Sequence, residues 1–334
     1  MEKKPGYELD NEDVKLKLVE KDLELEYIST DGDFAVYGSD LEESEKIHRK
    51  NISYWGDVYR RVKQNKGAVI SFWVLVVLVF LCIFGPFMSE FSFRQMNSTI
   101  GDQWNWTVIK EGHWFGTDVF GRDVWVRLWE GGRVSFLIAL VTVISEGIFG
   151  TVYGGLSGLV GGKLDVVMMR IVEIIMCIPS MLYIILFMMV LGPGIGTIMI
   201  AMAISTWPML AIIVRGEVLR IKNYEYVMAA EVLGASKGRV LMKHLLPNTM
   251  GVIIVKLTLD IPGAIFTCAF LSFIGIGVPP PNASLGSLAF TGYTQLYSAP
   301  YLFFFPAILI SLITLTFNLI GDGLRDALDP KLRH

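Results

Sequence analysis

The sequence predicts an all-α membrane protein that crosses the bilayer six times. Hydrophobic residues make up 53% of the 334 residues and charged residues only 18%, below the roughly 25% that is usual in soluble proteins. Two runs carry no charge at all, 22 residues over 67–88 and 20 residues over 301–320. As helices, both are long enough to span a hydrocarbon core about 30 Å thick. These observations favour a polytopic bundle of transmembrane helices.

Six apolar segments are expected to be the spans. They cover about 67–88, 134–160, 164–190, 195–215, 249–275 and 301–321. Lys and Arg gather before the first span, at the second-to-third turn and between the fourth and fifth spans, and such residues mark the cytoplasmic side. Both chain ends are therefore expected in the cytoplasm. Spans three to six each contain a proline, which removes a backbone hydrogen bond and is expected to kink the helix: Pro179, Pro208, Pro262 and Pro306.

Three regions are expected along the chain. They are an acidic cytoplasmic tail over 1–56, a first transmembrane helix with an outer loop over 57–133, and a core of five transmembrane helices over 134–334. Residues 1–50 carry 15 acidic and 8 basic side chains, whereas the rest carries 17 acidic and 21 basic ones. The tail is expected either to be disordered or to form a small β-hairpin, because apolar and charged residues alternate over 14–18 and 23–27.

Glycines recur in steps of four at the end of the second span, at Gly150, Gly154, Gly158 and Gly162. Residues four apart share one helix face, and small residues there let a neighbouring helix approach until the two backbones nearly touch. The ridge is expected to pack against another helix of this chain or of a partner subunit. The alternative is that the glycines reflect only the general abundance of glycine in membrane helices.

The segment 226–248, between the fourth and fifth spans, is polar and basic. The Ala229–Ala230 pair is small and has high helix propensity, so a short helix there could approach another protein closely. Gly234 is expected to end that helix, Ser236 to cap a second one and Pro247 to stop it. An ordinary solvated loop with a basic bias is the alternative.

The spacing of the alanine pair, Gly234 and Leu246–Pro247 resembles the cytoplasmic "EAA" loop of ATP-binding-cassette importer permeases. In that family the loop forms the coupling helix that docks into a groove on an ATPase subunit. The residues assigned to this contact are Tyr226, Ala229, Ala230, Gly234, Ser236, His244 and Pro247. Met228 departs from the family pattern, which usually has glutamate there.

The resemblance covers roughly residues 60–330 and is specific to the C-type permease subunits of dipeptide, oligopeptide and nickel importers. It rests on the segments 113–133, 154–179, 271–281 and 318–330, of which the last, Asn-Leu-Ile-Gly-Asp-Gly-Leu-Arg-Asp-Ala-Leu-Asp-Pro, is the most specific. The chain departs from the family pattern at Glu173, Lys256, Asp260, Cys268 and Leu285.

The resemblance implies a type I importer permease fold with six transmembrane helices and a coupling helix between helices four and five. It also implies a bacterial plasma-membrane complex with a paralogous second permease, two ATPase subunits and an extracellular substrate-binding protein that delivers a peptide. ATP and Mg²⁺ would bind the ATPase partners, since this chain has no P-loop sequence and no cofactor of its own is expected. Nickel or another small solute is the alternative cargo, and a passive channel or scaffold is the alternative function.

No catalytic or metal site is expected, and no nucleic acid partner. The histidines, His48, His113, His244 and His334, are scattered, and the three cysteines lie in apolar runs where they are expected to be small buried hydrophobes. An intramembrane enzyme would need paired catalytic residues that the sequence does not offer.

Charged residues inside apolar runs are candidates for function. Lys256 and Asp260 lie four apart on one face of the fifth span, so they can pair. They are expected to line the translocation pathway, with a buried structural pair or a pair with the partner permease as the alternatives. Glu146 also lies in an apolar run, and the Arg170–Glu173 pair is expected to be structural. On the outer loop, the group formed by Asp118, Arg122 and Asp123 is expected to brace the loop, with contact to an external protein as the alternative.

Overall fold

A computed structural model describes residues 54–96 and 112–328. The chain divides into two units, Met1–Ser53 and Tyr54–His334, and every helix described below belongs to the second. The hairpin predicted over 14–18 and 23–27 therefore falls outside the described residues. Regular structure in the described part is helical, with one isolated bridge between Thr117 and Asp123.

The elements follow one another with short connections. They are α2 (Tyr54–Gln64), α3 (Lys66–Phe84), the 3-10 turn η1 (Gly85–Met88), α5 (Val124–Val160), α6 (Gly162–Cys177), α7 (Ser180–Leu191), α8 (Ile195–Ile221), α9 (Glu225–Val232), α10 (Lys237–Val240), the π-helical turn η2 (Leu241–Leu245), α11 (Leu246–Phe273), α12 (Leu285–Thr294) and α13 (Tyr301–Leu328).

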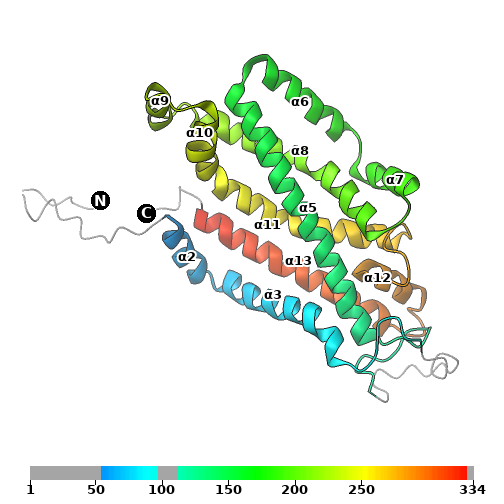
Figure 1. The fold of residues 1–334 in the computed structure, drawn as a ribbon. Helices are drawn as coiled ribbons and strands as arrows, with labels where there is room; N and C mark the ends of the chain where they lie inside the picture. Colours follow the sequence, from blue (N-terminus) through cyan, green and yellow to red (C-terminus); the bar gives the residue numbers. More distant parts are fainter. Residues whose placement is uncertain (1–53, 97–111, 329–334) are drawn as a thin grey trace, which may run out of the picture. The chain divides into compact units, whose positions relative to one another are not determined.

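In Figure 1 the long helices α3, α13 and α11 run in roughly the same direction, and α5 passes diagonally across the view of α8, α11 and α13. The most extensive contact is between α5 and α8, while α11 packs on both α5 and α13, and α13 also packs on α3. The largest group of buried side chains joins α5, α7, α8, α11 and α13, and includes Ile138, Ile184, Ile198, Ile265 and Ile313. The apolar stripes of these helices therefore meet in one core.

Within residues 54–96 and 112–328, five helices are long and apolar enough to cross a membrane, or six if the bent pair α6–α7 counts as one span. The expectation of one helix over 164–190 is wrong in this respect, because α6 and α7 meet at an angle of 79°. The break falls at Ile178, which is extended (φ −94°, ψ 121°), as a residue that precedes a proline prefers to be. At Pro208, Pro262 and Pro306 the helices continue without interruption.

The second span begins at Val124 rather than near 134. The Asp123 side chain accepts a hydrogen bond from Val126 N at 2.7 Å and so caps the helix. Arg127 in the first turn is buried, and its guanidinium donates to Phe93 O at 3.2 Å. In the sequence the charged residues over 127–133 suggest a solvated loop. In the structure they lie on a helix, and tertiary contacts such as the Arg127–Phe93 bond stabilise them there.

Three of the four ridge glycines, Gly150, Gly154 and Gly158, lie where α5 faces α8. A Cβ atom on Gly150 would lie 2.8 Å from Leu210 Cβ, one on Gly154 would clash with the Ala211 carbonyl oxygen, and one on Gly158 would lie 2.9 Å from Val218. The backbones of α5 and α8 therefore approach too closely for a larger residue. Gly162 does not belong to this ridge, because α5 ends before it; Gly162 has a φ of +59° and nothing within 4 Å of a Cβ.

The ridge gives a testable pair of variants. Gly154→Ala should lower the free energy of unfolding by about 1–3 kcal/mol, because the added methyl group meets the α8 backbone, which cannot move aside. Gly216→Ala, on the open face of α8 with nothing within 4 Å, should be neutral or stabilise by up to about 1 kcal/mol through helix propensity. Thermal unfolding of the purified protein in detergent measures both, and equal effects would contradict the close contact.

Candidate functional site

The loop between α8 and α11, residues 222–245, is folded into two short helices and a π-helical turn. We refer to it as the α8–α11 loop. At the end of α9, Gly234 has a φ of +84°, and its N–H donates to Glu231 O at 2.9 Å, while Ala235 N–H donates to Ala230 O at 3.0 Å. These two bonds form a Schellman motif, which requires a left-handed residue at the glycine position.

The next helix begins as the sequence predicts. The Ser236 hydroxyl accepts a hydrogen bond from Arg239 N at 3.4 Å and caps α10. The prediction that Pro247 stops this helix is wrong, because Lys237–Phe273 is helical throughout and Pro247 lies in the first turn of α11. The π-helical turn η2, with Leu246 N–H bonded to Leu241 O five residues earlier, shifts the hydrogen-bond pattern just where proline lacks a donor.

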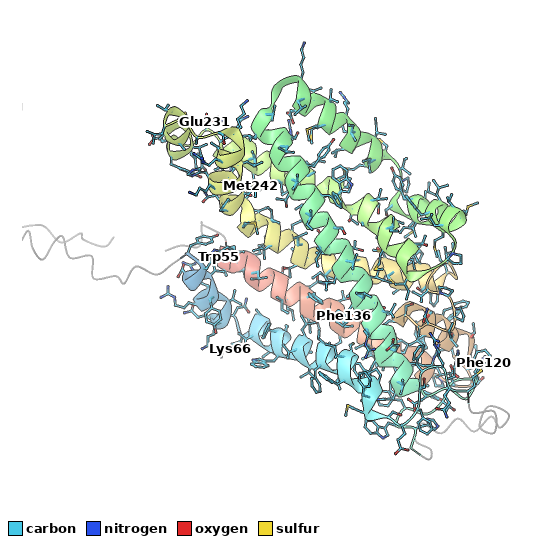
Figure 2. All side chains as sticks on the ribbon, in the orientation of Figure 1. Trp55, Lys66, Phe120, Phe136, Glu231 and Met242 are labelled. Atoms are coloured by element: carbon cyan, nitrogen blue, oxygen red, sulfur yellow. The ribbon has the colours of Figure 1, made fainter. Side chains whose placement is uncertain are left out.

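The α8–α11 loop is anchored on one side and exposed on the other. Val227, Val240 and Leu245 are fully buried in a cluster with Val214 and Val218 of α8. In contrast, Val232 and Leu233 are both 87% exposed. Figure 2 labels Glu231 on α9 and Met242 just after α10, both on this loop. The loop thus holds an exposed apolar tip in a fixed position.

All seven residues assigned to this contact lie on the surface, six in the loop and Pro247 in the first turn of α11. Exposed or partly exposed are Tyr226, Ala229, Ala230, Gly234, Ser236, His244 and Pro247. The rings of Tyr226 and His244 lie near one another, with centroids 6.4 Å apart. The loop therefore brings the beginning of α9 and the π-helical turn onto one small surface.

A second site is a half-open pocket in the bundle, with exposed residues such as Ser180 and Met209 in its wall. A cavity of about 320 Å³ is lined by α5, α7, α8 and α11, with the side chains Thr142, Glu146, Ser180, Ile184, Met202, Ser205, Thr206, Met209, Lys256, Asp260, Ala264 and Thr267 around it. Lys256 Nζ forms an ion pair with both carboxylate oxygens of Asp260, as their spacing predicts. Both side chains are about three-quarters buried.

Glu146 on α5 reaches the same ion pair. Its Oε1 atom lies 4.0 Å from Lys256 Nζ, and its side chain is only 3% exposed. In the sequence Glu146 stands out as a charge within a span, but nothing there connects it with Lys256, because the two residues are far apart in the chain. Only the packing of α5 on α11 brings them together.

A third polar group fastens α6 to α8 and was not expected from the sequence. Arg215 binds both oxygens of Asp165, with Nε and NH2 distances of 2.5 Å. Ser157 Oγ on α5 donates to the same carboxylate at 2.5 Å, and Lys222 Nζ donates to Gly158 O at 3.1 Å. The Arg170–Glu173 pair forms as expected, but on the surface of α6.

The outer loop is held by ion pairs of its own. Asp118 binds Arg122 at 2.7 Å and lies 3.6 Å from Arg127, while Asp123 binds His113 Nδ1 at 2.6 Å. All five side chains are buried. Asp118 and Arg122 therefore brace the loop, whereas Asp123 pairs with His113 rather than with Arg122.

The comparisons with known proteins identify the family. Residues 150–334 match the binding-protein-dependent transport system inner membrane component, and residues 53–103 match the N-terminal transmembrane domain of oligopeptide transport permease C. The chain is 45% identical over 291 residues to the oligopeptide transport system permease protein OppC of Bacillus subtilis, covering 87% of this chain and 94% of that protein. The chain belongs to this permease family.

Other relatives agree with this membership. The dipeptide transport system permease protein DppC of Bacillus subtilis is 44% identical, with 87% of this chain and 90% of that protein covered. Escherichia coli OppC is 39% identical over 87% of this chain and 95% of that protein. The fold is similar to a solved chain of the MetNI methionine ABC transporter in an inward-facing conformation, with a TM-score of 0.51 at 18% identity over 61% of this chain and 96% of that one.

Family membership establishes the class of protein. The chain is a multi-pass membrane permease subunit of an ABC importer and not an enzyme. The fold is that of a type I importer permease. Within this permease, the α8–α11 loop, the cavity and the Asp165–Arg215 pair are the polar features that the bundle arranges.

The Asp165–Arg215 pair should contribute more to stability than an exposed pair on the same helix. Asp165→Ala should lower the free energy of unfolding by about 1.5–3 kcal/mol, because it removes charge-assisted hydrogen bonds that join α6 to α8. Glu173→Ala, which breaks a pair whose two side chains are 73% and 55% exposed, should change it by at most about 1 kcal/mol. Thermal unfolding in detergent measures both variants. Similar losses of stability would show that the Asp165–Arg215 pair does not stabilise the contact between α6 and α8.

Proposed function

We propose that this permease imports oligopeptides or dipeptides, driven by ATP hydrolysis on partner subunits. The observation that carries the proposal is the pair of relatives that are 45% and 44% identical over 87% of the chain, which are named as oligopeptide and dipeptide transport permeases. Such identity over nearly the full span of both relatives favours a shared cargo class. The complex lies in the bacterial plasma membrane, with the α8–α11 loop and both chain ends on the cytoplasmic side.

In this proposal the α8–α11 loop docks on an ABC ATPase subunit. Two features support it. The Schellman motif and the Ser236 cap fix the backbone of the loop, so its shape does not have to form on binding. Val232 and Leu233 are exposed although they are apolar, and burying them against a partner groove would remove them from water. ATP and Mg²⁺ would be held by the two ATPase subunits.

The translocation pathway, in this proposal, runs beside the cavity between α5, α8 and α11. Lys256 and Asp260 lie on its wall, and intramembrane charges that are partly open to a cavity are typical of substrate pathways. A paralogous permease would complete the pathway, and an extracellular binding protein would deliver the peptide. These partners follow the arrangement that the family resemblance implies.

The rival functions predict other features. A passive channel has no use for a rigid apolar tip such as Val232–Leu233. A nickel importer of the same family is the alternative cargo class, and the peptide proposal is favoured over it because both Bacillus subtilis relatives are named for peptides.

Reconstitution tests the function directly. The chain should copurify from its native membrane with a second permease and two ATPase subunits. In proteoliposomes with the binding protein outside and ATP inside, this complex should accumulate a radiolabelled tripeptide or dipeptide, and omission of ATP should abolish uptake. Accumulation of nickel without peptide uptake would overturn the peptide proposal.

The docking loop is tested by two glycine variants with the same backbone strain. Gly234→Val forces a β-branched residue into a left-handed conformation, which costs about 1–2 kcal/mol and disrupts the Schellman motif. It should abolish peptide uptake and weaken copurification of the ATPases. Gly275→Val, just after α11, is the matched control, because Gly275 has a φ of +85° and the same two backbone bonds, from its own N–H to Ser272 O and from Ile276 N–H to Leu271 O; it should be strained equally but retain the ATPases. Full uptake by the Gly234 variant would rule out the docking assignment.

A further inference from the structure

We propose that Glu146, held beside the Lys256–Asp260 pair, binds the α-ammonium group of a peptide as the peptide passes through the permease. The inference rests on the proposed function and adds to it the chemical group that the cavity recognises. It gives a role to Glu146, a charged residue of α5 that takes no part in the contacts of the α8–α11 loop.

The charges of the cavity do not balance without a further cation. Two carboxylates, those of Glu146 and Asp260, converge on one ammonium group. Lys256 Nζ is bound to both oxygens of Asp260, and at 4.0 Å it is beyond hydrogen-bond distance from Glu146. Lys256 is the one basic side chain among the described residues that line the cavity. The cluster therefore carries a net charge of −1 when all three groups are ionised.

The position of Glu146 makes this unbalanced charge costly. Its side chain is 97% buried, and it shares its nearest cation, Lys256, with Asp260; a buried carboxylate with only part of a counter-ion is expensive, because the surroundings replace little of the hydration that it loses. A cation that bound Glu146 would stabilise its negative charge as Lys256 stabilises that of Asp260. The cavity is thus arranged to bind a positively charged group.

The cavity also offers hydrogen-bond acceptors for an ammonium. Thr142 and Ser205 donate their hydroxyl hydrogens to the carbonyl oxygens of Ile138 and Met202, so both hydroxyl oxygens can still accept hydrogen bonds. Thr206 Oγ1 is buried and makes no hydrogen bond to any described residue. A primary ammonium has three N–H donors, which a carboxylate and two hydroxyl oxygens can satisfy.

The rest of the wall fits an organic cation better than a metal ion. Ile184, Met202, Met209 and Ala264 supply apolar surface, which can contact the first side chain of a peptide. A volume of about 320 Å³ is at the lower end of ligand sites, roughly 300–1,000 Å³, so it would hold one end of a peptide and not its full length. A divalent metal ion would gain nothing from the apolar wall.

The electrostatic part of the proposal can be measured in the purified complex. Ser180→Cys places a thiol at the cavity, in a Cys177→Ser background that removes the exposed native thiol, while Cys82 and Cys268 are buried. A cationic methanethiosulfonate should react with this thiol at least about tenfold faster than an anionic one, because a nearby unit charge acts strongly in a low-dielectric site. Glu146→Gln should lower this ratio and Lys256→Gln should raise it.

The opposite signs test whether the two variants change the charge of the cavity. If the substitutions instead disturbed the fold, they would shift the reaction ratio in the same direction. That result would overturn the proposal. An unchanged ratio in Glu146→Gln would overturn it as well, because it would mean that Glu146 carries no charge.

Peptide protection tests the ligand. Trialanine should slow the reaction of the thiol at position 180, whereas Nα-acetyl-trialanine at the same concentration should not, and Glu146→Gln should abolish the protection by trialanine. Equal protection by the two peptides would overturn the ammonium site. Absence of protection by either peptide, with ATP-driven peptide uptake intact, would also overturn it but would leave the proposed function standing. Absence of peptide uptake by the wild-type complex would overturn both.

Discussion

The close approach of α5 to α8 is the contact on which the polar groups of the bundle depend. Lipid tails are as apolar as leucine, so helices in a bilayer gain little from hydrophobic burial and associate through close packing. Gly150, Gly154 and Gly158 remove the side chains that would separate the two backbones. With α5 fixed on α8, Ser157 and Arg215 both reach Asp165 of α6, and Glu146 is held in the wall that α11 completes.

Two kinds of rigidity coexist in the α8–α11 loop. Its inner side is tied to the bundle by fully buried aliphatic side chains from α9 and from the π-helical turn. Its outer tip is held by backbone bonds of the loop itself, through the Schellman motif at Gly234. A surface that keeps its shape before a partner binds avoids part of the entropy cost of ordering a loop on association.

The sequence predicts the class of fold well, because the length of an apolar run determines whether a helix can cross the bilayer. The roles of Gly234 and Ser236 were also predictable, since local chain geometry favours those residue types at helix ends. The start of α5 at Val124 was not, because Arg127 becomes compatible with a helix only when Phe93 O and Asp118 surround it. Pairs such as Asp165–Arg215 and Glu146–Lys256 depend on which helices become neighbours, and no local pattern encodes that. The same limit explains Gly162, whose spacing matches a ridge that ends one turn earlier.

The π-helical turn at Leu241–Leu245 has a geometric consequence for α11. A π turn takes up one more residue than an α turn, and each residue of an α-helix advances the side-chain direction by about 100°. The single helical rod from Lys237 to Phe273 therefore carries a phase offset between its cytoplasmic end and its bilayer end. The direction in which Lys256 and Asp260 point is set relative to α10 by that one residue. A rotation of this helix at its loop end would therefore turn Lys256 and Asp260 around the helix axis.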